Sequence, residues 1–207
     1  MDRTGIMGRE MWDARFEGED YLFGTEPAIF VTERAGILAD GSEILCVADG
    51  EGRNSVWLAE QGHAVTAFDI SPVGVEKARA LATRRGAKVD FHIAGIDDWD
   101  WSRSYDSVAG IFIQFLSPEA RPQAFSRIRD AIRPGGVLLL HGYAPRQVEY
   151  GTGGPPFAEN MYTLDLLHDA FAGWEVLHAD DYDRHIDEGP GHSGLSALVD
   201  FVARKPD

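Results

Sequence analysis

Short apolar runs alternate with amphipathic stretches along most of the chain. Five runs have the length and composition of buried strands, at 44–48, 64–68, 89–94, 105–113 and 137–141. Stretches with helical spacing, or with helix start and stop residues, lie around them at 8–17, 27–35, 55–60, 72–85, 117–133 and 163–171. Ser71 and Pro72 form a start signal of this kind, and Gly86 forms a stop signal. This alternation of strands and helices predicts an α/β fold built on a parallel sheet.

The last third of the chain follows a different pattern. Two further strands are predicted at 174–179 and 196–203, and the connection between them, 180–195, holds five Asp or Glu residues, three Gly and one Pro. A helix does not fit such a connection, so the two strands are predicted to pair antiparallel. The sequence therefore predicts a seven-stranded, mostly parallel sheet with a C-terminal antiparallel hairpin and helices on both faces.

Length and charge narrow the function. A chain of 207 residues suits one domain, which we divide into an N-terminal cap segment at 1–40 and a core at 41–207. The 34 acidic and 19 basic residues leave a net charge of −15. Phosphate backbones and anionic lipids repel such a chain, so neither nucleic acid nor a membrane surface is an expected partner.

The single cysteine and the placement of the apolar residues predict that the protein is located in the cytoplasm. Cys46 is the single cysteine, and it falls inside an expected strand, where it fits a small buried residue. The first residues, 1–5, carry no signal-peptide core, and no apolar run is long enough to cross a bilayer. His185 and His192 lack the tight spacing of metal ligands on a regular element, so no metal is expected.

The strongest motif lies at the first strand. Gly50 and Gly52 follow the apolar run at 44–48, and a helix begins directly after them. Glycines at this position let a ligand approach the backbone, and the start of the helix offers free N–H groups. Asp69 ends the next strand nineteen residues after Gly50, close to the spacing that places a carboxylate on a ribose diol. A dinucleotide fingerprint requires a third small residue, Gly or Ala, where this chain has Ser55.

The turn 48–54, with the sequence Ala-Asp-Gly-Glu-Gly-Arg-Asn, instead resembles the first motif of the class I S-adenosylmethionine-dependent methyltransferases. The similarity extends from about Trp12 to Lys205 and is greatest to the small bacterial group that includes the tellurite-resistance and thiopurine methyltransferases. The residues that carry it outside the turn are Trp12, Asp13, Arg15, Phe16, Tyr21, Gly24, Thr25, Glu26, Pro27, Ile132, Pro134, Gly135, Gly136, Asp187, Glu188, Gly189, His192 and Gly194. This resemblance implies a Rossmann-like class I methyltransferase fold, and the terminal hairpin agrees with it.

The resemblance also implies where S-adenosylmethionine binds. The expected donor-binding residues are Asp49, Gly50, Glu51, Gly52, Asn54, Asp69, Ile70, Ile96, Asp97 and Ile111. Asp49 or Glu51 is expected to pair with the ammonium of the donor, and Asp69 to accept hydrogen bonds from its ribose. Gly95 stands where the family has the acid that contacts adenine, so this contact is expected from Asp97 or Asp98. Cys46 stands where most members have an acid in the first strand.

The acceptor is expected to be a small molecule bound beyond the carboxyl ends of the strands. Gln114, Tyr21 and His192 are the predicted catalytic residues. The glycine-rich loop 142–160 either folds over the same site or is a flexible surface loop, and the sequence leaves both open. The family resemblance favours a soft nucleophile, a thiol or chalcogen compound, which reacts without a strong base. A phenol or an amine usually needs one, for which His141, His192, Tyr21 and Tyr143 are candidates.

Two other functions are considered. A nicotinamide-dependent oxidoreductase is disfavoured by Ser55 and by the lack of residues suited to hydride transfer. A protein that binds S-adenosylmethionine without catalysing transfer has the same motifs, so the sequence leaves it open. We expect a monomer or a homodimer.

Overall fold

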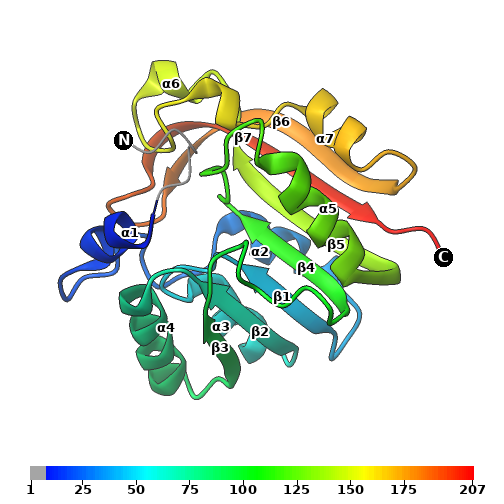
Figure 1. Ribbon diagram of the computed structural model, residues 1–207. Coiled ribbons are helices and arrows are strands. Elements are labelled where there is room, and N and C mark those ends of the chain that lie inside the picture. The colour runs from blue at the N-terminus through cyan, green and yellow to red at the C-terminus, as the bar shows by residue number, and fades with distance from the viewer. Residues whose placement is uncertain (1–7) are drawn as a thin grey trace.

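The sheet has a parallel part and an antiparallel part. The computed structural model describes residues 8–207, and its strands run in the order β3-β2-β1-β4-β5-β7-β6 (Figure 1). Their bounds are β1 (Glu43–Val47), β2 (Ala64–Asp69), β3 (Val89–Ile93), β4 (Tyr105–Ile111), β5 (Ile132–Tyr143), β6 (Glu175–Asp187) and β7 (Ser193–Arg204). The first five strands pair parallel, whereas β7 pairs antiparallel with both β5 and β6. The predicted seven-stranded sheet with its terminal hairpin is confirmed.

Helices cover both faces of this sheet (Figure 1). Their bounds are α1 (Arg9–Phe16), α2 (Ile29–Arg34), α3 (Arg53–Glu60), α4 (Pro72–Arg85), α5 (Arg121–Ala131), α6 (Gln147–Tyr150) and α7 (Leu164–Ala170), with 3-10 turns η1 (Ala35–Ile37) and η2 (Ala158–Asn160). On one face Phe125 of α5 and Leu167 of α7 pack on the strands, and on the other Phe30 of α2 and Leu58 of α3 do so. Alternate strand residues such as Leu45 and Cys46 enter opposite cores, which is why these runs are apolar throughout.

The start and stop signals of α4 behave as predicted. The hydroxyl of Ser71 accepts a hydrogen bond from the amide of Gly74 at 3.1 Å, which caps the helix, and Pro72 is its first residue. Gly86 ends the helix with φ at +67°, a conformation that favours glycine. The bounds of α4 therefore agree with the sequence pattern.

Two predicted boundaries are wrong. The helix expected over 117–133 begins only at Arg121, because the preceding residues form a turn, and Ile132 already pairs with Tyr105 as part of β5. The connection 180–195 is almost entirely strand, and only residues 188–192 lie outside β6 and β7. Pairing with β7 holds β6 extended despite its low apolar content, and its charged residues suit the edge of a sheet.

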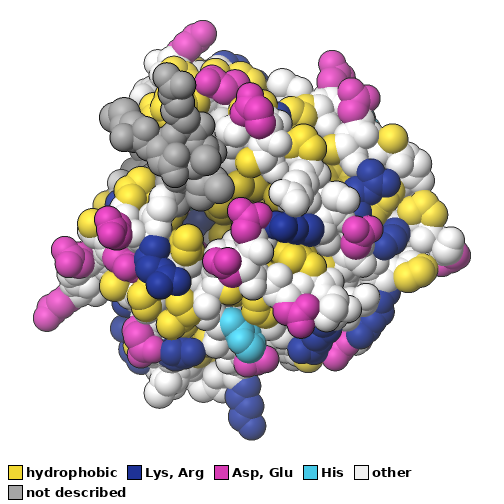
Figure 2. All heavy atoms as spheres, viewed as in Figure 1, with side chains coloured by type: hydrophobic (Ala, Val, Ile, Leu, Met, Phe, Trp, Pro, Cys, Tyr) yellow, Lys and Arg dark blue, Asp and Glu magenta, His cyan; other side chains and the backbone are white. Residues whose placement is uncertain are grey.

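The surface carries charges of both signs. Figure 2 shows Asp and Glu side chains interspersed with Lys and Arg over the face in view, and no single basic field. Within residues 8–207, none of the helices has the length and apolar character needed to cross a membrane.

Candidate active site

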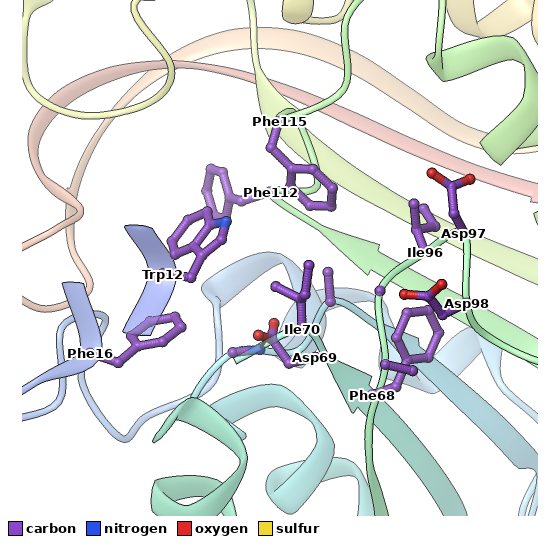
Figure 3. A pocket seen from close by; sticks show the side chains of 14 residues that line it. Trp12, Phe16, Phe68, Asp69, Ile70, Ile96, Asp97, Asp98, Phe112 and Phe115 are labelled. Carbon is purple, nitrogen blue, oxygen red and sulfur yellow. Dashed lines mark hydrogen bonds between the residues drawn. The ribbon is translucent and has the colours of Figure 1, made fainter. Parts of the chain in front are cut away.

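A cavity of about 120 Å³ lies at the carboxyl ends of β1, β2 and β4 (Figure 3). We call it the donor cavity, and its wall is made of Trp12, Phe16, Ala48, Gly50, Phe68, Asp69, Ile70, Ala94, Gly95, Ile96, Asp97, Asp98, Phe112 and Phe115. It lies on the edge of the sheet where open α/β folds bind ligands.

Asp69 occupies the middle of the donor cavity (Figure 3). One carboxylate oxygen accepts from the amide of Gly50 at 2.9 Å, and the other accepts from the amide of Ser71 at 2.8 Å. Each oxygen keeps a further lone pair, so the carboxylate can still accept hydrogen bonds from a pair of hydroxyls. Burial raises the pKa of Asp69 to about 6. The predicted acid therefore lies in the cavity, held in place by the glycine turn.

The two glycines of the turn have different roles. Gly50 lines the donor cavity with φ at +61°. Gly52 does not line it: a Cβ atom at this position would lie 2.6 Å from the Cβ of Ala78, so the missing side chain lets the turn pack against α4. Gly52 was predicted to let the ligand approach the backbone. In the structure Ala78 fills the space beside Gly52, and Gly52 does not line the cavity.

The two acidic residues of the turn, Asp49 and Glu51, also make different contacts. Glu51 is 2% exposed, and its carboxylate accepts from the amide of Leu22 at 2.8 Å and pairs with Lys77 at 2.6 Å. It therefore ties the cap segment to α4, which corrects its predicted role at the donor ammonium. The carboxylate of Asp49 accepts from the hydroxyl of Ser55, and burial raises the pKa of Asp49 to about 7. Asp49 is the remaining carboxylate of the turn, and it is not among the residues that line the cavity.

Two further predicted donor residues lie outside the wall of the cavity. The side-chain oxygen of Asn54 accepts from the amide of Ala28 at 2.9 Å, so it anchors the segment that leads into α2. Ile111 packs in the core with Phe30 and Cys46. Neither side chain lines the donor cavity, so their contact with a donor stays a prediction.

The far end of the cavity has an apolar and an acidic side. Ile70 and Ile96 form part of its wall, and Asp97 and Asp98 lie beside them (Figure 3). The carbonyl oxygen of Ile96 accepts from the indole of Trp101 at 2.9 Å, and Asp97 pairs with Arg127. This arrangement suits a flat ring held between apolar side chains and an acid at its edge.

The cap segment closes the other end. Trp12 and Phe16, both on α1, point into the cavity (Figure 3). Arg9 donates to the carbonyl oxygen of Ile70 at 3.0 Å, so α1 is attached directly to the segment after β2. Tyr21 is not in the cavity, because its hydroxyl donates to the carbonyl oxygen of Lys77 at 2.8 Å on α4. Tyr21 therefore lines neither cavity, and its catalytic role stays a prediction.

A second cavity, of about 80 Å³, shares three aromatic wall residues with the first: Trp12, Phe112 and Phe115. We call it the acceptor cavity, and the rest of its wall is Arg15, Phe23, Gln114, Tyr143, Gly154, Pro155, Gly191 and His192. Gln114 and His192 are thus brought together as predicted, and loop 142–160 contributes to the wall. The amide of Gln114 is occupied, because it accepts from the amide of Tyr143 at 2.6 Å and donates to the carbonyl oxygen of that residue at 2.7 Å. Gln114 therefore positions Tyr143.

His192 is the buried imidazole of the acceptor cavity. It is 6% exposed, its ring lies 4.2 Å from that of Phe112 and 4.4 Å from that of Phe23, and its Nδ1 atom has no hydrogen-bond partner among residues 8–207. Burial lowers the pKa of His192 well below its usual value, and the positive charges of Arg53 and Arg15 lower it further. The ring is therefore neutral at physiological pH.

Backbone strain marks the wall between the cavities. Phe112 has φ at +57° and Ala48 has φ at +50°, both unusual for residues that carry a Cβ atom. The amide of Phe112 donates to the carbonyl oxygen of His141 at 2.8 Å, which ties this strained residue, directly after β4, to β5. Such strain is concentrated at functional sites in proteins. Sequence reasoning missed Phe112 and Phe115, and the position of both directly after the fourth strand was the available signal.

Within the described part of the chain, no three His, Cys, Asp or Glu side chains are grouped in a way that could hold a metal ion.

The sequence is similar to that of known methyltransferases. Residues 44–136 match the family model described as "Methyltransferase domain". The ubiquinone biosynthesis O-methyltransferase of Xanthomonas axonopodis pv. citri is 28% identical over 144 residues, which are 68% of this chain and 59% of the relative. The carboxy-S-adenosyl-L-methionine synthase of Aeromonas salmonicida is 34% identical over 85 residues, 40% of this chain and 34% of that protein. The chain thus spans under two thirds of the length of these curated relatives.

Solved structures agree on the fold. TehB from Haemophilus influenzae superposes with a TM-score of 0.70 at 17% identity, covering 95% of this chain and 66% of TehB. A structure solved for the conversion of a disulfide bond into a thioacetal group during echinomycin biosynthesis superposes with a TM-score of 0.76 at 23% identity, covering 95% and 91% of the two chains. Residues 44–136 therefore resemble a methyltransferase domain in sequence, and the fold of the described residues is that of these solved structures.

Proposed function

We propose that the protein transfers a methyl group from S-adenosylmethionine to a small molecule bound in the acceptor cavity. The sulfonium of the donor supplies an activated methyl group. The residues of the donor cavity fit this molecule: Asp69 suits the ribose hydroxyls, the wall around Ile96 suits the adenine, and the turn at Gly50 suits the methionine part. Asp49 is the candidate partner of the ammonium. The aromatic wall shared by the cavities sets the methyl group beside the acceptor and excludes water.

The state of His192 supports a soft nucleophile as the acceptor. A neutral imidazole whose protonation is opposed by burial and by two guanidinium groups is a weak base. It suits poorly the removal of a proton from a phenol, whose pKa is about 10. A thiol has a pKa of about 8.5, and the same positive charges favour its ionised form. We therefore propose a thiol or another chalcogen compound, and this neutral buried histidine is the observation that carries the proposal.

Oxygen methylation is the second candidate. The Nδ1 atom of His192 has no partner in the described part of the chain and lies in the acceptor cavity, so it is free to take a proton from a hydroxyl acceptor. The similarity to ubiquinone biosynthesis O-methyltransferases favours the same chemistry. Methylation of a hydroxyl requires His192 to accept the proton of that hydroxyl, whereas methylation of an ionised thiol does not. Replacing His192 therefore distinguishes the two candidates.

Calorimetric titration with S-adenosylmethionine, S-adenosylhomocysteine and NAD tests the donor. We expect both adenosyl ligands to bind, NAD not to bind, and Asp69→Ala to weaken adenosyl binding at least tenfold. Asp90→Ala removes an exposed carboxylate on β3 and serves as the matched control. Binding of NAD alone, or of none of the three, would contradict the proposal.

Transfer of a labelled methyl group to thiophenol, phenol and aniline tests the acceptor. Because the three compounds share one ring, they compare sulfur, oxygen and nitrogen at equal size. We expect turnover of thiophenol, and little effect of His192→Gln once the pH is high enough to ionise the thiol. Turnover of phenol alone, abolished by His192→Gln, would favour oxygen methylation. Tight donor binding with no turnover of any acceptor would favour a binding protein without transfer activity.

A further inference from the structure

The acceptor cavity holds a cation without a counter-ion. Arg15 contributes to its wall, and no Asp or Glu within residues 8–207 pairs with its guanidinium. The guanidinium lies 4.8 Å from the ring centre of Trp12 and 5.7 Å from that of Phe23. Arg15 is exposed as a whole residue, but partial burial of its side chain lowers the pKa of its guanidinium. By contrast, Arg53 pairs with Glu188 at 2.8 Å.

A buried hydroxyl without a partner lies in the same cavity. Tyr143 is 1% exposed, and its oxygen makes no hydrogen bond among the described residues. Its position is rigid, because Gln114 holds its backbone on both sides and because Gly153 and Gly154 pack against its ring. A Cβ atom at Gly153 would lie 3.0 Å from the hydroxyl oxygen. Leaving such a group unpaired costs about 1–3 kcal/mol, so a bound ligand that accepts its hydrogen bond is favoured.

These groups belong to one continuous surface. The ring of Phe23 lies under Arg15 and 4.4 Å from the ring of His192, which in turn lies 5.7 Å from the ring of Tyr143. The cavity therefore offers a guanidinium, a phenolic hydroxyl and an imidazole on walls that are otherwise aromatic. In a chain with a net charge of −15, an anion needs such a local cation in order to bind.

We propose that the methyl acceptor is an aromatic or apolar carboxylic acid, whose carboxylate is bound by Arg15 and Tyr143 while a separate atom of the same molecule receives the methyl group. This inference rests on the proposed function, and it specifies the substrate class of that site. Guanidinium groups bind carboxylates through paired, charge-assisted hydrogen bonds, and the phenolic hydroxyl adds a third donor. The aromatic wall holds the body of the molecule.

Binding of two matched product analogues tests the proposal without requiring turnover. The ligands are 3-(methylsulfanyl)benzoate and its neutral counterpart 3-(methylsulfanyl)benzamide, titrated into the full chain with and without S-adenosylhomocysteine. We expect the benzoate to bind at least tenfold more tightly than the benzamide, since hydrogen bonds to charged groups contribute about 1.5–3 kcal/mol. Arg15→Gln is expected to remove this preference, and Tyr143→Phe to weaken binding of the benzoate about fivefold or more.

Arg84→Gln is the matched control. Arg84 also lies over an aromatic ring, 5.1 Å from that of Tyr21, but it is outside the acceptor cavity. The control makes the same change of net charge, so it is expected to keep the preference for the benzoate. A preference lost equally in both variants would assign it to the overall charge and overturn the proposal.

The wild-type protein alone can also overturn the proposal. Equal affinity for benzoate and benzamide, or no binding of either, is incompatible with a carboxylate site at Arg15. Failure of the proposed function gives a different result: the benzoate preference persists, but no labelled methyl group reaches thiophenol or 3-mercaptobenzoate. If neutral thiols are methylated as well as thiols that carry a carboxylate, the proposed methyltransferase function is supported and the proposed carboxylate site is contradicted.

Discussion

Replacing Gly52 by alanine tests whether this glycine serves packing and not ligand approach. Its φ of +88° is unfavourable for a residue with a Cβ atom, at a cost of roughly 1–2 kcal/mol. The new Cβ atom would also lie 2.6 Å from the Cβ and 2.9 Å from the Cα of Ala78, an overlap of the kind that costs about 1–3 kcal/mol. We therefore expect the free energy of unfolding to fall by about 2–5 kcal/mol.

Thermal unfolding followed by circular dichroism measures this loss. For a chain of this size 1 kcal/mol corresponds to a Tm change of about 2–4 °C, so Gly52→Ala is expected to lower the Tm by roughly 4–20 °C. Gly50→Ala is the matched control. It has a similar φ of +61°, but its Cβ atom would meet only the ring of Phe16, at 3.4 Å. The control is expected to lose about 1–2 kcal/mol from backbone strain alone.

A double-mutant cycle isolates the steric part. Ala78→Gly removes the opposing Cβ atom and is expected to cost about 1 kcal/mol by itself, because glycine is unfavourable inside a helix. The double variant with Gly52→Ala is then expected to be more stable than the sum of the two single losses, by about 1–3 kcal/mol. Strictly additive losses, or a loss at Gly52 no larger than at Gly50, would refute the packing role of Gly52.

Two further outcomes follow from the donor cavity and its cap. Burial raises the pKa of Asp69 to about 6, and the ribose hydroxyls require the ionised carboxylate, so affinity for S-adenosylhomocysteine is expected to fall as the pH drops through 6, by up to about tenfold per unit. Titration calorimetry from pH 5 to 8 measures this affinity. If Asp69→Asn shows the same pH dependence, the titrating group is Asp49 and not Asp69. Glu51→Gln breaks a buried pair with Lys77, so a loss of about 3–5 kcal/mol in unfolding free energy is expected from chemical denaturation, and an unchanged midpoint would contradict it.

The fold was accessible from the sequence because its signals are local. The parallel strands are continuous apolar runs buried on both faces, and the helices between them carry their own start and stop residues, as Ser71 and Gly86 show. The long hairpin was underestimated for the opposite reason. Residues 180–187 are mostly polar, and their extended conformation depends on pairing with β7, which lies further along the chain. Pairing with a distant partner leaves no trace in local hydrophobicity.

The site was accessible only in part. Asp69 was found because its position is fixed by spacing: it ends the strand after the glycine turn, and its carboxylate accepts from Gly50. Glu51 lies one residue from Gly50, yet its side chain turns to Leu22 and Lys77, and no spacing rule indicates which way a side chain points from a turn. For the same reason the sequence did not indicate that Tyr21 lines neither cavity and that its hydroxyl donates to the carbonyl oxygen of Lys77.

The cap segment connects the two cavities physically. Trp12 forms part of both walls, and it lies on α1, which is fastened to the segment after β2 through Arg9 and Ile70. Phe112 faces it from the end of β4 and also belongs to both walls. One wall of the acceptor cavity thus comes from the segment that covers the donor, and the other comes from a strained residue of the sheet. A change in how α1 docks is therefore expected to alter both cavities together, because Trp12 moves with this helix.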